Sequence, residues 1–290
     1  MKSVIKILSC LSMKALYALA DYFLYPLLFY VVRYRRKLCY RNMRTAFPDW
    51  SEQQIRELQK RFYHHFVDVI VEIVRSYRAS EEEMQNYIQF PNLAEIERWT
   101  IANGGLFFML GHMGNWEFTA DVQHRFLNPD IQHYNVYRRQ RNASADSIML
   151  HIREKRSGEG SCLEKNMLLR HLIRIRQTGK PYTLGLIADQ KPSPKNQHYW
   201  TDFLHHDTSF LDGGEVLSRK FGAAVGYVHI TKPQRGQYIA RVDLITDRPN
   251  EQEANYITEQ FARRLEANII EQPELWLWTH NRWKWSRDSK

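Results

Sequence analysis

The sequence predicts an α/β fold in which a largely parallel central sheet is flanked by helices, behind an N-terminal membrane-associated helix. Short apolar runs alternate with longer amphipathic segments, a pattern typical of strands that alternate with helices. The 290 residues are 43% hydrophobic and 25% charged, which is enough for one large folded domain. The first 45 residues differ, because they join an apolar segment to a basic cluster. We therefore divide the chain into a membrane-associated part, 1–45, and an α/β domain, 46–290.

The N-terminal segment from Val4 to Val32 is rich in Leu, Ile, Tyr, Phe and Ala, with charges only at Lys6, Lys14 and Asp21. Its longest uncharged run, 22–32, is shorter than the roughly 20 residues that span a bilayer. As one continuous helix the segment could cross with a tilt or lie in the interface. A cleaved signal peptide and an ordinary amphipathic core helix are the alternatives.

A basic cluster follows the apolar segment, and no acid occurs between positions 33 and 45. Such a cluster favours the cytoplasmic side and anionic headgroups. The net charge of +9 also indicates an anionic partner, or only solubility. The three cysteines are widely separated and show no metal spacing or disulfide framework, which favours a reducing compartment. The basic residues of the cluster are Arg33, Arg35, Arg36, Lys37, Arg41 and Arg44.

The elements of the second part follow from periodicity. Ser51 to Tyr77 predicts a helix, because Ser51 can cap it and apolar residues recur every three or four positions. Predicted strands are 106–110, 132–137, 182–188, 225–231 and 238–245. Predicted helices are 115–127, 143–156, 163–178 and 251–271.

The stretch from Gly111 to Glu117 reads Gly-His-Met-Gly-Asn-Trp-Glu and directly follows the first strand. On a regular helix, His112 and Glu117 would lie about 140° apart around the axis. They can pair only if His112 occupies a turn and Glu117 the first turn of the following helix. A carboxylate held to one imidazole nitrogen makes the other a base for a hydroxyl that attacks a thioester. Asn115 is a candidate to support the turn or the oxyanion, together with backbone amides at the helix start.

Polar residues also follow the next two predicted strands. Arg138 ends the second strand, and Asp189 and Gln190 end the third. In a parallel sheet these residues would meet His112 at the carboxyl edge, where open α/β sheets bind ligands. A turn cap for Asp189 and a solvated charge for Arg138 remain the structural alternatives.

With these residues in place, the chain resembles the bacterial lipid A biosynthesis acyltransferases, within the lysophospholipid acyltransferase-like superfamily. The superfamily signature is His, four residues, then Asp or Glu, and 112–117 fits its Glu form. The likeness covers nearly the whole chain. It includes 34–37 with Asn42 and 46–48, then 136–138 with Asn142 and Arg153, then 188–190, and finally 273–278 with His280 and 282–284.

The resemblance implies an inner-membrane enzyme whose active site faces the cytoplasm, with an acyl-carrier-protein thioester as donor and no metal or redox cofactor. It implies His112 as base and Glu117 as its partner. Asn115, Arg138, Arg153, Asp189 and Gln190 become candidates for binding substrate and holding the site together. Two departures leave the acceptor lipid open: Arg139 replaces an expected Pro, and 203–205 reads Phe-Leu-His where Phe-Phe-Gly is usual.

Other interpretations stay open. A lysophospholipid or amino-acid lipid could be the acceptor, or the chain could be a catalytically silent lipid-binding protein. His205, His206 and Asp207 suggest a metal site or a polar loop. The C-terminal tryptophans (276, 278, 283 and 285) suit nucleic-acid stacking, a membrane-interface belt or core packing, and we expect no nucleic-acid partner. Basic residues on the helix predicted at 163–178 form a solvated face or a docking surface for the donor: Lys165, Arg170, Arg174 and Arg176.

Overall fold

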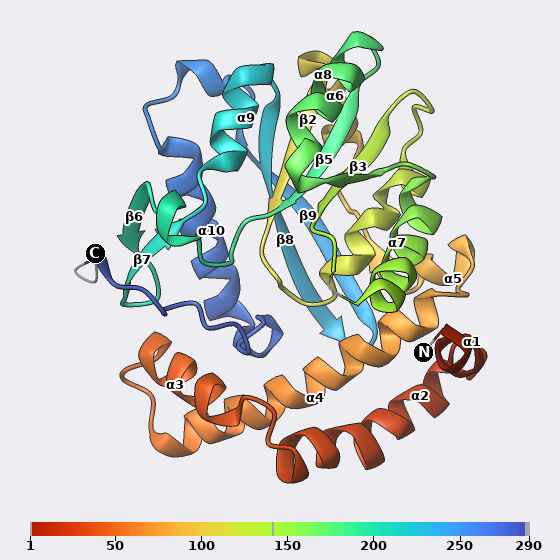
Figure 1. The fold of residues 1–290 in the computed structure, drawn as a ribbon, viewed down its shortest axis with the longest axis vertical. Coiled ribbons are helices and arrows are strands. Elements are labelled where there is room, and N and C mark those ends of the chain that lie inside the picture. Colours follow the sequence, from red (N-terminus) through yellow and green to blue (C-terminus); the bar gives the residue numbers. More distant parts are fainter. Residues whose placement is uncertain (1, 141, 288–290) are drawn as a thin grey trace.

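The computed structural model describes residues 2–140 and 142–287 and has a seven-stranded sheet at its centre (Figure 1). The strand order is β1-β9-β8-β2-β5-β3-β4, and every neighbouring pair is parallel except β8 with β9. A separate antiparallel pair, β6 Tyr199–Asp202 with β7 Asp207–Phe210, lies outside this sheet. The sheet strands are β1 Ile88–Gln89, β2 Gly105–Leu110, β3 Gln132–Tyr137, β4 Cys162–Glu164, β5 Tyr182–Ile187, β8 Ala224–Gln234 and β9 Gln237–Thr246.

Helices flank the sheet, so the predicted α/β architecture with a mostly parallel sheet is confirmed. The α-helices are α1 Lys2–Leu8, α2 Met13–Leu19, α3 Arg36–Ala46, α4 Glu52–Ser76, α5 Glu81–Gln85, α6 Leu93–Asn103, α7 Ala143–Ser157, α8 Leu168–Gln177, α9 Gly213–Phe221 and α10 Tyr256–Glu271. Two π-helical segments, Ala20–Leu24 and Leu27–Val31, continue α2. Short 3₁₀ helices include Trp116–Arg125.

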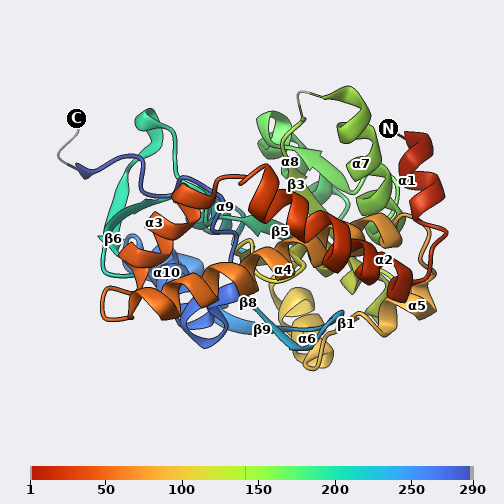
Figure 2. The same cartoon turned by 90° about the horizontal axis from the view of Figure 1, so that it is seen from below.

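The helices from α1 to α4 form a layer beneath the end of the sheet to which β8 points (Figures 1 and 2). Ser51 caps α4, and its side chain and that of Gln54 bond each other's backbone amides. Among the described residues no single helix is long and apolar enough to cross a membrane; Lys2–Leu8 with Met13–Val31 meets the test only as a pair bent by 118°.

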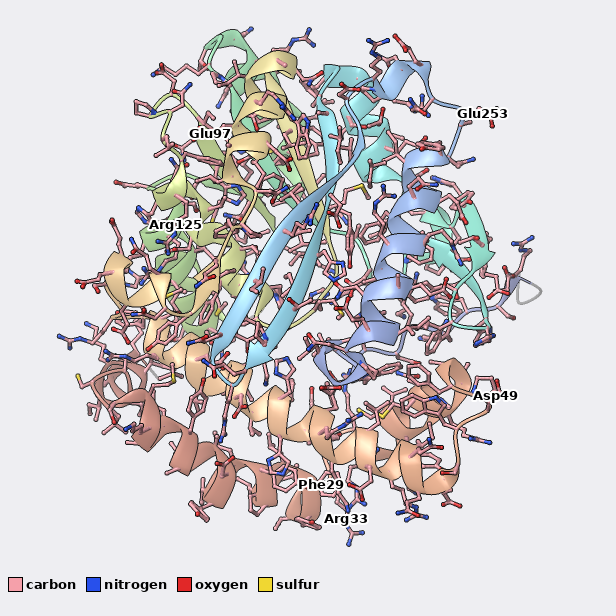
Figure 3. All side chains as sticks on the ribbon, turned by 180° about the vertical axis from the view of Figure 1, so that it is seen from behind. Phe29, Arg33, Asp49, Glu97, Arg125 and Glu253 are labelled. Atoms are coloured by element: carbon pink, nitrogen blue, oxygen red, sulfur yellow. The ribbon has the colours of Figure 1, made fainter. Side chains whose placement is uncertain are left out.

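The outer side of this layer exposes large apolar side chains, since Tyr22 is 86% exposed and Val31 is 72% exposed. The inner side packs on α4, where Tyr25 stacks on His64 with ring centroids 3.6 Å apart. Phe29 and Arg33, which belong to this N-terminal layer, lie at the bottom of Figure 3. Membrane association of this segment stays a prediction.

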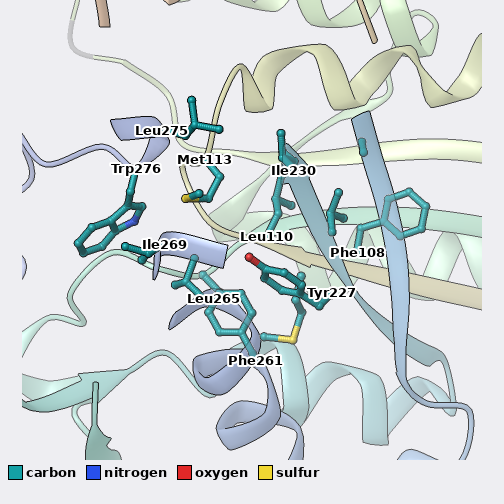
Figure 4. Packing of buried hydrophobic residues seen from close by; sticks show 14 of the residues in the cluster. Phe108, Leu110, Met113, Tyr227, Ile230, Phe261, Leu265, Ile269, Leu275 and Trp276 are labelled. Carbon is teal, nitrogen blue, oxygen red and sulfur yellow. The ribbon is translucent and has the colours of Figure 1, made fainter. Parts of the chain in front are cut away.

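The apolar core lies between the sheet and its helices. Figure 4 shows part of it, where Phe261 and Leu265 of α10 pack beside Tyr227 of β8. The four C-terminal tryptophans differ in burial. Trp276 and Trp278 are buried, as the core-packing alternative expects, while Trp283 and Trp285 are partly exposed.

All five predicted strands and the helix at 51–77 are confirmed, but three helix predictions need correction. Residues 115–127 form the 3₁₀ helix Trp116–Arg125 rather than an α-helix. The segment 163–178 begins as edge strand β4, because residues 162–164 bond to β3, and becomes α-helical only at Leu168. The helix at 251–271 starts at Tyr256, after a short 3₁₀ turn at Pro249–Glu251.

Candidate active site

The turn from Gly111 to Asn115 connects β2 to the 3₁₀ helix and carries His112 at the carboxyl edge of the sheet. Two of its positions require glycine. Gly114 has a φ of 54°, and a Cβ there would lie 2.9 Å from Ile230 Cγ2. A Cβ at Gly111 would lie 2.5 Å from Leu265 Cδ1. The glycines therefore allow the turn to pack directly against β8 and α10.

His112 is hydrogen-bonded to Asp189, which follows the neighbouring strand. Nδ1 of the imidazole lies 2.6 Å from Asp189 Oδ1. The backbone N–H of His112 donates to Asp189 Oδ2 at 2.8 Å, and Trp276 Nε1 donates to the same oxygen at 2.9 Å. The parallel register that pairs Leu110 with Ile187 places both strand ends side by side. The predicted meeting of His112 and Asp189 at this edge is therefore confirmed.

The sequence predicts that Glu117 accepts a hydrogen bond from His112, and the structure corrects this prediction. Glu117 instead accepts two hydrogen bonds from Arg153 of α7, 2.7 Å from Nε and 2.6 Å from Nη2. A guanidinium matches a carboxylate with two parallel bonds, so it holds Glu117 more tightly than one imidazole N–H can. In the described part of the chain, Asp189 is the carboxylate that bonds the ring. Glu117 still acts on His112 through its charge.

The charges at the site favour ionised acids beside a basic imidazole. Burial lowers the pKa of His112, but the carboxylates of Asp189 and Glu117 outweigh burial, so this pKa is raised above its ordinary value. Burial raises the pKa of Asp189, yet His112 and Trp276 bring it down to about 2. Burial also raises the pKa of Glu117, and Arg153 more than reverses this.

The second nitrogen of the imidazole, Nε2, lies on the exposed side of the ring. An ionised Asp189 only accepts, so the ring carries its proton on Nδ1 and leaves Nε2 as an acceptor. Gln190 Nε2 lies 3.3 Å from His112 Nε2. The side chain of His112 is 13% exposed, against 3% for that of Asp189. His112 can therefore accept a proton from a bound hydroxyl that takes the place of the Gln190 amide.

Two other predicted site residues, Asn115 and Arg138, lie outside the hydrogen bonds that hold the His112 imidazole. Asn115 is buried, and its amide donates to Glu72 Oε2 of α4 at 2.9 Å, so it supports the turn. Arg138 lies just after β3, and for this residue the structure shows no ion pair or hydrogen bond within the described ranges. A contact with substrate is therefore the role that remains proposed for Arg138.

The C-terminal segment closes the turn from the other side. Leu277 N–H donates to the His112 carbonyl at 3.1 Å, and Gly114 N–H donates to the Leu275 carbonyl at 3.0 Å. Figure 4 shows Met113 beside Leu275 and Trp276. The sequence showed this segment only as part of a resemblance, so the bond from Trp276 to Asp189 was not predicted.

The metal-site interpretation of 205–207 is not supported. Nowhere in the described ranges do three His, Cys, Asp or Glu side chains gather as metal ligands would. His206 stacks on Trp283, and Asp207 pairs with Arg287. These residues form the turn and start of the second strand in the β6–β7 hairpin.

Comparison with known families gives a match over nearly the whole chain. A family model described as bacterial lipid A biosynthesis acyltransferase matches residues 3–285. The chain belongs to the bacterial lipid A biosynthesis acyltransferase family. Membership in the lipid A biosynthesis acyltransferase family indicates an acyltransferase activity, and it implies an acyl donor and a lipid acceptor. No individual curated protein matched the sequence.

Proposed function

We propose that the protein transfers a fatty acyl chain from an acyl-carrier-protein thioester to a hydroxyl of a lipid A precursor or a related glycolipid. The observation that carries this proposal is the His112 imidazole, held at Nδ1 by Asp189 at 2.6 Å, with Nε2 on the exposed side beside the Gln190 amide. The family match over 3–285 supplies the reaction class.

His112 acts as the general base in the proposed mechanism. Nε2 takes the proton of the acceptor hydroxyl as its oxygen attacks the thioester carbonyl and forms a C–O bond. The tetrahedral intermediate then collapses, the C–S bond breaks, and the imidazolium returns the proton to the leaving thiolate. Asp189 holds the ring and stabilises the imidazolium that forms, as a buried carboxylate does in hydrolase triads.

Glu117 contributes through its negative charge, which raises the basicity of His112, while Arg153 fixes its position. The acceptor hydroxyl binds where the Gln190 amide lies beside His112 Nε2. Arg138, just beyond the end of β3, is the candidate for an anionic group on donor or acceptor. Asn115 maintains the turn.

The proposed location is the cytoplasmic face of the inner membrane, with 1–45 as the membrane-associated part and 46–290 as the catalytic domain. Large apolar side chains on the outer side of the N-terminal layer favour an interfacial position, among them Tyr22, Phe23 and Val31. The following basic cluster suits anionic headgroups and an acidic carrier protein.

The central test measures acyl transfer from an acyl-carrier-protein thioester to a lipid A precursor, with purified wild type and His112→Ala. We expect turnover in the wild type and a loss of at least about 10³-fold in the variant, because the base is removed. Activity of His112→Ala close to wild type would refute the role of His112.

The acceptor is tested in cells by lipid profiling of a deletion strain. Loss of one acyl chain from lipid A supports the proposed acceptor, whereas a change confined to phospholipids or amino-acid lipids would replace it. Flotation with vesicles that contain anionic lipid tests the location, with Tyr22→Glu/Phe23→Glu expected to bind more weakly. Equal binding of this variant and the wild type would contradict the interfacial position.

A further inference from the structure

A buried carboxylate in α4 joins three parts of the protein that are distant in sequence. Glu72 is fully buried and accepts three hydrogen bonds from neutral groups. Tyr17 of α2 donates to Oε1 at 2.8 Å. Asn115 of the catalytic turn donates to Oε2 at 2.9 Å, and Tyr238 of β9 donates to the same oxygen at 2.8 Å.

This carboxylate has no cation in contact with it in the described part of the chain. Asp68 lies one helical turn earlier and raises the pKa of Glu72, and the guanidinium of Arg235 pairs with Asp68 and Asp21 rather than with Glu72. Burial raises the pKa of Glu72, and the hydrogen bonds from Asn115, Tyr238 and Tyr17 only partly offset this effect. A well-packed apolar side chain at position 72 would be less costly for folding. The contacts of Glu72 therefore indicate a purpose other than stability.

The contact with Asn115 fixes one end of the catalytic turn. Asn115 is three residues after His112, and its carbonyl accepts from Phe118 N–H at 3.0 Å to begin the 3₁₀ helix that carries Glu117. The other side of the turn is held by Leu275, Leu277 and Asp189. Glu72 thus holds the Asn115 end of the turn from the α4 side, while His65 of the same helix faces the Gly114 backbone.

We propose that Glu72 is a positioning residue for acyl transfer: by accepting the Asn115 amide, it sets the turn that places His112 and Glu117. This inference rests on the proposed function of His112. It assigns to α4 a part in catalysis without any contact between Glu72 and the substrate.

The experiment exchanges the hydrogen-bond donor at position 115 and the acceptor at position 72. In Asn115→Asp two buried carboxylates face each other and share a proton at low pH. At high pH both are ionised and repel, so kcat there falls by about 10- to 100-fold relative to wild type, the usual cost of displacing catalytic groups by about 1 Å. In the double variant Glu72→Gln/Asn115→Asp, the new amide at position 72 donates to the new carboxylate at position 115, and kcat recovers at least about ten-fold from this loss. Glu72→Gln alone still accepts from Asn115 and keeps kcat within about three-fold of wild type. KM for both substrates changes little in each variant, because ground-state binding is untouched.

Asp68→Asn is the matched control. Asp68 is buried on the same helix but bonds Arg235 rather than the turn, so this variant is expected to lower the melting temperature and leave kcat unchanged. The ¹⁵N resonances of the His112 imidazole report the ring position without turnover. They are expected to shift in Asn115→Asp and return in the double variant.

Equal kcat and equal imidazole spectra for Asn115→Asp, whether or not Glu72→Gln is also present, would overturn the proposal. A wild type without acyl transfer would refute the proposed function instead, and the imidazole spectra would still decide whether Glu72 positions the turn.

Discussion

Asp189→Asn tests the arrangement of the site most directly, because the structure dictates how the new amide must orient. Asp189 Oδ2 accepts from two fixed donors, His112 N–H at 2.8 Å and Trp276 Nε1 at 2.9 Å. In the variant the amide oxygen must therefore take this position. The amide NH₂ then faces His112 Nδ1, which lies 2.6 Å from Oδ1 in the wild type.

An N–H that points at Nδ1 forces the imidazole into its other tautomer. Nδ1 becomes the acceptor, the proton moves to Nε2, and Nε2 can no longer take a proton from a hydroxyl. The same change in a hydrolase triad lowers kcat by about 10⁴, or about 5 kcal/mol at 1.36 kcal/mol per decade. We expect a loss of this order in Asp189→Asn. Raising the pH should not restore activity, because the fault lies in the tautomer and not in the charge.

The assay follows acyl transfer from the acyl-carrier-protein thioester across a range of pH, alongside ¹⁵N spectra that distinguish the two imidazole tautomers. Asp212→Asn is the control, since Asp212 bonds His198 Nδ1 at 3.0 Å outside the site, and it should leave kcat unchanged. A loss of less than about ten-fold, or a His112 ring that keeps its proton on Nδ1, would refute the reasoning.

Three further predictions concern charge and backbone. In the wild type, kcat/KM should fall as pH drops through a His112 pKa above about 6.5, because protonated His112 is no base; a midpoint below that value would contradict the raised pKa. Glu117→Gln should move this midpoint to lower pH, because the Glu117 charge raises the pKa of His112. The same variant should lower the free energy of unfolding in urea by about 3 kcal/mol, since Arg153 loses its buried partner. An unchanged pH profile and an unchanged stability would argue against both effects. His205→Gly should stabilise the protein by about 0.5 kcal/mol, because Leu204 and His205 have φ of 52° and 60° in the β6–β7 turn; a lower melting temperature would show that His205 makes a compensating contact.

Much of the fold follows from local pattern. The strands at 106–110 and 182–188 could be predicted because buried parallel strands are short apolar runs between turn residues. Residues 163–178 could not be divided correctly, since Leu168, Leu172 and Ile175 share one helical face but their spacing does not show where the helix begins. Only the pairing of 162–164 with β3 makes the first part a strand, and strand pairing is not a local property.

The candidate site was predictable as a set of residues but not as a set of bonds. His112, Asp189 and Gln190 could be brought together because each follows a parallel strand. Proximity in the chain favoured Glu117 as the partner of the imidazole, whereas the partner is set by the register of β2 with β5. Glu72 was hidden for a related reason: it lies within an apolar stretch of α4, and only the folded chain brings Asn115, Tyr17 and Tyr238 to it.

The bonds from 275–277 to the turn that carries His112 have a consequence for biosynthesis. His112 and Asp189 leave the ribosome long before Leu277, so the nascent chain holds both residues while the turn still lacks its C-terminal partners. Trp276 also reaches Asp189 only in this late step. The order of synthesis therefore delays completion of the candidate site until all strands of the sheet have been made. A chain arrested before residue 275 would carry His112 and Asp189 without the bonds from 275–277 that complete their arrangement.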